Sequence, residues 1–90
     1  MQTIYKYILD SWLVGQPQTV NMKKSAKILS SAMQNDKLCI WAIVDTESPD
    51  EQRSFIIIGT GHNLASSFKL NYISTVQDSP YVWHLFEIMT

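Results

Sequence analysis

The segment Gly59-Thr60-Gly61-His62 holds the residues best suited to binding an anion. Two glycines two positions apart let backbone N–H groups converge on a phosphate, and Thr60 and His62 add side-chain donors. The third glycine of a dinucleotide-binding fingerprint is absent because Leu64 stands in its place, and no strand–helix–strand unit surrounds the segment. Two interpretations follow, a phosphate-binding loop or a plain turn that needs no ligand.

Arg53 is the sole arginine of the chain. Its planar guanidinium fork suits carboxylate or phosphate recognition, and it opens an apolar segment that reads as a strand. Arg53 is therefore a candidate clamp for a second oxyanion. The alternative is a salt bridge at the strand edge, to Glu47 or Glu51.

The side chains that serve in catalysis or metal binding are few and scattered. His62 and His84 are the only histidines, and one cysteine gives no metal-ligand spacing. We expect His84, beside Trp83, to be a packed and hydrogen-bonded core residue. Cys39 sits inside an apolar run, where a thiol is usually inert. The sequence therefore predicts a protein that is not an enzyme, with no catalytic residue, no metal and no cofactor.

Aromatic side chains are more numerous than a small core needs. They can stack on a base or anchor a subunit interface, and we select Trp41 and Trp83 as faces for a ligand. The full set comprises Tyr5, Tyr7, Trp12, Trp41, Tyr72, Tyr81 and Trp83.

Composition limits the class of protein. Ninety residues make one domain, and a net charge of −1 argues against a nucleic-acid binder. A single cysteine, no apolar run of membrane-spanning length and no signal-peptide pattern at the start predict a cytoplasmic protein without a membrane partner.

Isoleucine-rich segments with alternating faces, bounded by turn residues, predict strands rather than helices. The fold class expected is all-β or nearly so: a single β domain over residues 1–90, built as a small antiparallel sandwich or barrel of six to seven short strands with at most one short helical turn. The expected strands are Thr3–Leu9, Thr19–Met22, Ala26–Gln34, Leu38–Asp45, Arg53–Thr60, Leu70–Gln77 and Tyr81–Ile88, with Thr46–Gln52 as a polar loop.

The segment Ala26–Gln34 also fits a helix, because Ile28, Leu29, Ala32 and Met33 fall at helical spacing. We prefer a strand, since the turn dipeptide Asn35-Asp36 is followed by a strongly strand-like run. As a strand, the segment is expected to have Ala26, Ile28 and Ser30 on one face and Lys27, Leu29, Ser31 and Met33 on the other.

Three of the expected strands are apolar on both faces: Leu38–Val44, Phe55–Ile58 and Val82–Ile88. A small antiparallel sheet normally buries one face and exposes the other to water. The simplest cover for the second face is a symmetric copy of the same chain, so we expect a homo-oligomer.

A set of short segments spread over nearly the whole chain forms a familiar pattern. It comprises Ile4-Tyr5-Lys6-Tyr7, Ala26-Lys27-Ile28-Leu29-Ser30, Gln34-Asn35, Leu38–Asp45, Arg53, Phe55, Gly59–His62, Tyr72-Ile73, Thr75 and Val82–Glu87. Through these segments the sequence resembles a group of small phage- and prophage-encoded proteins. The resemblance implies an accessory phage protein made in the bacterial cytoplasm, in a class that includes anti-defence sponges built as compact homo-oligomers.

Together these observations predict a protein that sequesters a nucleotide-derived signalling molecule of host immunity without cleaving it. The alternatives are an inhibitor or adaptor that blocks a host protein and, third, a phosphate-ester hydrolase. The ligand-binding residues predicted are Arg53, Gly59, Thr60, Gly61, His62, Trp41 and Trp83.

Overall fold

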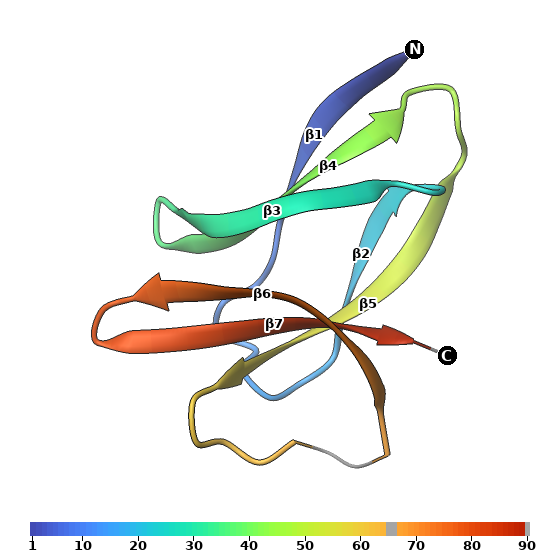
Figure 1. Ribbon diagram of the computed structural model, residues 1–90. Coiled ribbons are helices and arrows are strands. Elements are labelled where there is room, and N and C mark those ends of the chain that lie inside the picture. The colour runs from blue at the N-terminus through green and yellow to red at the C-terminus, as the bar shows by residue number, and fades with distance from the viewer. Residues whose placement is uncertain (65–66, 90) are drawn as a thin grey trace.

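The computed structural model describes residues 1–64 and 67–89, and these form seven strands and no helix. Figure 1 shows the strands arranged as two antiparallel sheets that pack face to face. Sheet A has the order β1-β4-β3, and sheet B has the order β2-β5-β7-β6. The predicted all-β fold is confirmed, and of the two architectures expected, sandwich or barrel, the structure is a sandwich. The strands are β1 (Gln2–Ile8), β2 (Gln18–Lys23), β3 (Lys27–Gln34), β4 (Lys37–Asp45), β5 (Asp50–Gly59), β6 (Lys69–Asp78) and β7 (Tyr81–Met89).

The central hairpin forms as the turn dipeptide indicates, so Ala26–Gln34 is not a helix. Asn35 and Asp36 both have positive φ, 52° and 63°. Two consecutive residues of that conformation connect strands whose twist matches, and Asn and Asp tolerate it best after glycine. Strand β5 starts earlier than predicted: residues 50–52 pair with β2, so the polar loop ends at Pro49.

The core lies between the sheets and follows the period-two alternation of the strands. Strand β4 contributes Leu38, Ile40, Ala42 and Val44 to it, and β5 contributes Phe55 and Ile57. Leu9, just past β1, is also buried there.

Bulges in β3 and β6 change which residues face the core. In β3 the register shifts between Ile28 and Ser30, which places Ser31 and Met33 on the inner face with Ile28. The alternation predicted for this strand, with Ile28 and Ser30 on one face, is therefore wrong beyond Leu29. In β6 the register shifts between Tyr72 and Ser74. The two bulged edges meet where the hydroxyls of Ser31 and Ser74 hydrogen-bond.

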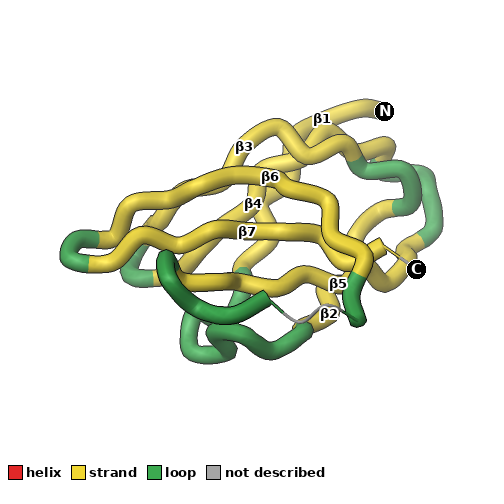
Figure 2. Tube along the Cα trace, turned by 60° about the horizontal axis from the view of Figure 1, so that its bottom comes forward, coloured by secondary structure: helices red, strands yellow, loops and turns green. Residues whose placement is uncertain are grey.

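The two sheets differ in how their outer faces are covered. Figure 2 shows residues 60–64, which follow β5, lying across sheet B. The outward-facing Ile56 and Ile58 of sheet B are only 2% and 4% exposed. On the outer face of sheet A, Ile4 and Ile8 remain 57% and 53% exposed. We call the outer face of sheet A, comprising Ile4, Ile8, Ala32, Trp41 and Ile43, the open face.

No stretch of helix capable of crossing a membrane occurs in the described part of the chain.

Candidate functional site

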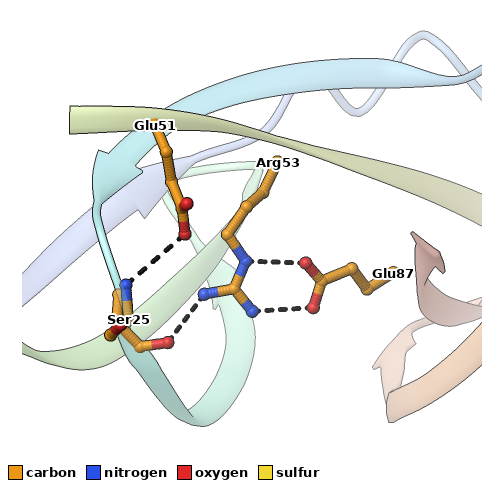
Figure 3. A network of polar contacts seen from close by, with 5 residues as sticks. Ser25, Glu51, Arg53 and Glu87 are labelled. Atoms are coloured by element: carbon orange, nitrogen blue, oxygen red, sulfur yellow. Dashed lines mark hydrogen bonds and ion pairs between the residues drawn. The ribbon is translucent and has the colours of Figure 1, made fainter. Parts of the chain in front are cut away.

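Arg53 lies near the start of β5 and forms a bidentate ion pair with Glu87 of β7 (Figure 3). Its Nε donates to Glu87 Oε2 at 2.6 Å, its Nη2 donates to Oε1 at 2.7 Å, and its Nη1 donates to the Ala26 carbonyl at 2.6 Å. These hydrogen bonds to Glu87 raise the pKa of Arg53. All three guanidinium nitrogens donate hydrogen bonds within the protein, so Arg53 is not available to bind an oxyanion of a ligand.

Arg53 therefore forms a salt bridge, as the alternative interpretation expected, but its partner is neither Glu47 nor Glu51. Glu51 instead accepts from the Ser25 backbone N–H at 3.4 Å. Glu87 is 34 residues away along the chain and is brought close by the pairing of β5 with β7. A hollow of about 490 Å³ lies beside Arg53 and Glu87, but Glu87 already neutralises the charge of the Arg53 guanidinium.

The Gly59–His62 segment closes as a turn. His62 N–H donates to the Gly59 carbonyl at 3.0 Å, and Thr60 N–H donates to the Val82 carbonyl at 3.3 Å. Two of the amides that could have converged on a phosphate are therefore used within the backbone. Gly61 has φ +85°, which requires glycine, and a Cβ on Gly59 would lie 2.6 Å from His62 Cε1. The geometry of the turn therefore explains both glycines without a ligand.

His84 bridges two threonines on the outer face of sheet B. Its Nε2 lies 2.8 Å from Thr60 Oγ1, and its Nδ1 lies 3.0 Å from Thr75 Oγ1, which in turn is 2.7 Å from the Tyr72 hydroxyl. The expected hydrogen bonding of His84 is confirmed, although the side chain is half-buried on the outer face and not in the core.

The two tryptophans selected from the sequence lie in different places. Trp41 lies on the open face, opposite Lys6 and Ser30 in the neighbouring strands. Trp83 packs against the core at the end of the sandwich where the β3–β4 and β6–β7 hairpins turn. Of the predicted ligand-binding residues, Gly59, Thr60, His62 and Trp83 line a common hollow of about 290 Å³. Gly61 belongs to the same turn but not to this lining, and Arg53 and Trp41 lie elsewhere.

A second hollow, of about 410 Å³, shares Tyr81 and Trp83 with the first and is walled by aromatic rings; we call it the aromatic hollow. The rings of Tyr81 and Trp83 stack with centroids 5.3 Å apart, and the Trp83 indole N–H donates to Asp78 Oδ2 at 3.2 Å. Trp12 stands in the loop between β1 and β2 with 93% of its surface exposed. The complete lining is Ser11, Trp12, Val14, Asp36, Asp78, Tyr81 and Trp83.

The loop that carries Trp12 is fixed at both ends and near its middle. Leu9 N–H donates to the Leu38 carbonyl at 2.8 Å, and Gly15 N–H donates to the Ile57 carbonyl at 2.7 Å. Between them Leu38 N–H donates to Ser11 Oγ at 3.0 Å. The Trp12 backbone N–H donates to Asp10 Oδ1 at 3.0 Å. The exposed indole is therefore presented by an ordered backbone.

Sequence reasoning missed the aromatic hollow because its residues come from three separate turns. One signal was available: the apolar Trp12, Leu13 and Val14 inside a segment otherwise marked as a loop by Gly15 and Pro17.

In the described residues no group of three or more His, Cys, Asp or Glu is placed to hold a metal ion. The arrangement defines a two-sheet antiparallel sandwich with an aromatic hollow at its hairpin end. The chain belongs to the DUF7352 family, a domain of unknown function, which it matches over residues 1–89. Neither a curated protein nor a solved structure matches it.

Proposed function

We propose that this protein acts by non-covalent binding and that the aromatic hollow receives its ligand. The observation that carries the proposal is Trp12, a large apolar side chain that is 93% exposed on a loop pinned by hydrogen bonds. Exposing an indole ring to water costs free energy, and this cost is recovered only when a ligand or partner covers the ring. Because the loop is already ordered, binding there costs little further backbone entropy.

The shape of the hollow supports the same proposal. Ligand sites are typically concave and largely apolar, with a few polar groups that fix orientation. Here Trp12, Tyr81 and Trp83 supply apolar walls, and Asp36 and Asp78 supply the polar groups.

The side chains most capable of chemistry are engaged in structural contacts, which favours binding over turnover. Cys39 is buried, with its Sγ 3.6 Å from the Lys37 carbonyl. His84 is held between two threonine hydroxyls, and Arg53 is paired with Glu87.

Sequestration of a nucleotide-derived signal stays a prediction, and so does the phage origin that the resemblance implies. Thr60 and His62, which can donate to a phosphate, line the neighbouring hollow. Tyr81 and Trp83 line both hollows. A nucleotide that stacks on this aromatic pair therefore belongs in the same binding test.

The test is calorimetry with ligands of each charge class against the wild-type protein and Trp12→Ala. The ligands are ADP-ribose and a cyclic dinucleotide, choline and N-acetyl-arginine amide, and the neutral 3,3-dimethylbutan-1-ol. We expect at least one ligand to bind with a Kd below about 1 mM, a free energy of about −4 kcal/mol. Trp12→Ala should weaken it at least about tenfold, while Ile4→Ala on the open face leaves it unchanged. Absence of binding, or equal binding by Trp12→Ala, contradicts the proposal.

We propose a second interaction, self-association through the open face. The chain covers the outer isoleucines of sheet B but leaves those of sheet A exposed. Among the described residues, strand β1, which carries Ile4 and Ile8 at the edge of sheet A, pairs with β4 alone, so its other edge can extend the sheet. A second copy offers a matching apolar face without any other partner being needed.

Light scattering tests this second proposal, because a dimer doubles the 10.3 kDa mass of the chain. Lys6 and Lys27 lie on the open face, opposite Trp41 and Ile43, so added salt, which screens their repulsion between copies, should strengthen the dimer. Ile8→Lys should yield the monomer, whereas Trp12→Ala should not. A wild-type mass near that of one chain at 100 µM protein contradicts self-association.

A further inference from the structure

The residues that line the aromatic hollow carry negative charge. In the part of the chain that the structure describes, its lining contains two carboxylates, Asp36 and Asp78, and no lysine, arginine or histidine. An anionic ligand would meet uncompensated negative charge there. A cation would meet two carboxylates and the faces of aromatic rings.

We propose that the aromatic hollow recognises an organic cation, an alkylammonium or guanidinium group carried on an apolar stem. This proposal rests on the proposed function, since it names the ligand chemistry of the same site. A cation over the face of an indole or phenol is attracted by the negative charge of the ring face, and tryptophan provides the strongest such contact. Carboxylates beside such rings add charge-assisted hydrogen bonds.

The two carboxylates come from the tips of two different hairpins. Asp36 is the second turn residue between β3 and β4, and Asp78 ends β6. The Trp83 indole N–H donates to Asp78 Oδ2, which fixes the carboxylate beside the ring that it would share with the cation. The stacking of Tyr81 on Trp83 fixes the aromatic wall.

Trp12, in the connection between β1 and β2, forms another wall of the site. Its backbone is held through Asp10 and Ser11, while its ring has few neighbours in the chain itself. A cation with an apolar stem would lie between Trp12 and the stacked pair. This arrangement explains an exposed tryptophan beside two acids, which neither core packing nor an anion site accounts for.

Two sources of such a cation are chemically equivalent at the site: a free small amine and an arginine or lysine side chain of another protein. The test therefore uses two matched pairs of probes. Choline is compared with its neutral isostere 3,3-dimethylbutan-1-ol, and N-acetyl-arginine amide is compared with N-acetyl-citrulline amide. Within each pair the shape is kept and the charge is removed.

We expect at least one cation to bind at least about tenfold more tightly than its neutral partner. Preference for choline indicates a free ammonium ligand, and preference for the arginine derivative indicates a protein side chain. Asp36→Asn and Asp78→Asn should each weaken the preferred cation about three- to tenfold. Asn tolerates the positive φ of residue 36, and at residue 78 its amide oxygen can still accept from Trp83, so both variants should fold.

Glu47→Gln removes the same charge from the connection between β4 and β5, which lies at the end of the sandwich opposite the β3–β4 and β6–β7 hairpin turns (Figure 1), and should leave the affinity unchanged. Equal binding of cation and neutral isostere, or binding of ADP-ribose that Trp12→Ala abolishes, overturns the cation proposal while the aromatic hollow remains the binding site. If none of the probes responds to Trp12→Ala, both the proposed function and this inference fail together.

Discussion

Replacing Glu87 by glutamine should be among the most damaging single changes in this protein. The substitution keeps the shape of the side chain and removes the negative charge that the Arg53 guanidinium faces at 2.6 and 2.7 Å. Arg53 and Glu87 are only 19% and 11% exposed, so water compensates the remaining charge poorly. Removing one partner of a buried ion pair costs about 3–5 kcal/mol, and the partial exposure of Arg53 places the expected cost near about 3 kcal/mol.

A loss of this size is easily measured in a 90-residue domain. At about 4–8 °C per kcal/mol, 3 kcal/mol lowers the Tm by about 12–24 °C. Urea unfolding should show a lower midpoint with an unchanged slope, because the surface exposed on unfolding is the same.

The matched control is Glu51→Gln, which makes the same chemical change in the same sheet. Glu51 accepts only a 3.4 Å hydrogen bond from Ser25, so its replacement should cost less than about 0.5 kcal/mol. The double variant R53M/E87L removes both charges and should recover most of the stability lost in Glu87→Gln. A cost below about 1 kcal/mol for Glu87→Gln would refute the structural role given to this pair.

Three further predictions concern single positions. Hydrogen bonds, first from the Glu47 backbone and then from the N-terminal amine, lower the pKa of Asp45, so NMR should show its carboxyl titrating below the ordinary value of about 3.9. The stability that the Asp45 carboxylate supplies is present above that pH and is lost as the pH falls through the lowered pKa. Asp45→Asn should remove this pH dependence. Gly59→Ala should lower stability by about 1 kcal/mol because its Cβ meets the His62 ring, and adding His62→Ala should restore part of the loss, since Trp83 Cζ3 still lies 3.1 Å from that Cβ, as urea unfolding can show. Asp36→Gly should be neutral or stabilising and Asp36→Val destabilising by about 1–2 kcal/mol, because φ is 63° there; equal Tm values for the two variants would contradict the turn assignment.

The strands were predictable because their signals are local. Alternating apolar residues and the Asn35-Asp36 dipeptide specify the central hairpin without reference to the rest of the chain. The bulge at Leu29 was not predictable in the same way, since it depends on pairing with β4 and on the contact of β3 with β6. A one-residue shift moves every later side chain to the other face, which is why the predicted alternation failed there.

The candidate site was predicted only in part, because it depends on contacts between distant segments. Gly59, Thr60, His62 and Trp83 do lie together, since β5 pairs with β7 and brings residue 59 opposite residue 83. Local sequence could not show that Glu87 would occupy the Arg53 fork. It also could not show that sheet A would keep Trp41 far from Trp83, or that Trp12 would stand beside Asp78.

The most direct test of binding at the aromatic hollow follows the three indole N–H signals in a ¹⁵N-labelled sample during titration with the cations and nucleotides named above. Trp12 and Trp83 line the hollow, whereas Trp41 lies on the open face and serves as an internal reference. We predict that a bound ligand shifts the Trp12 and Trp83 signals together and leaves Trp41 in place. Shifts confined to Trp41, or saturable binding that moves neither Trp12 nor Trp83, would contradict the account.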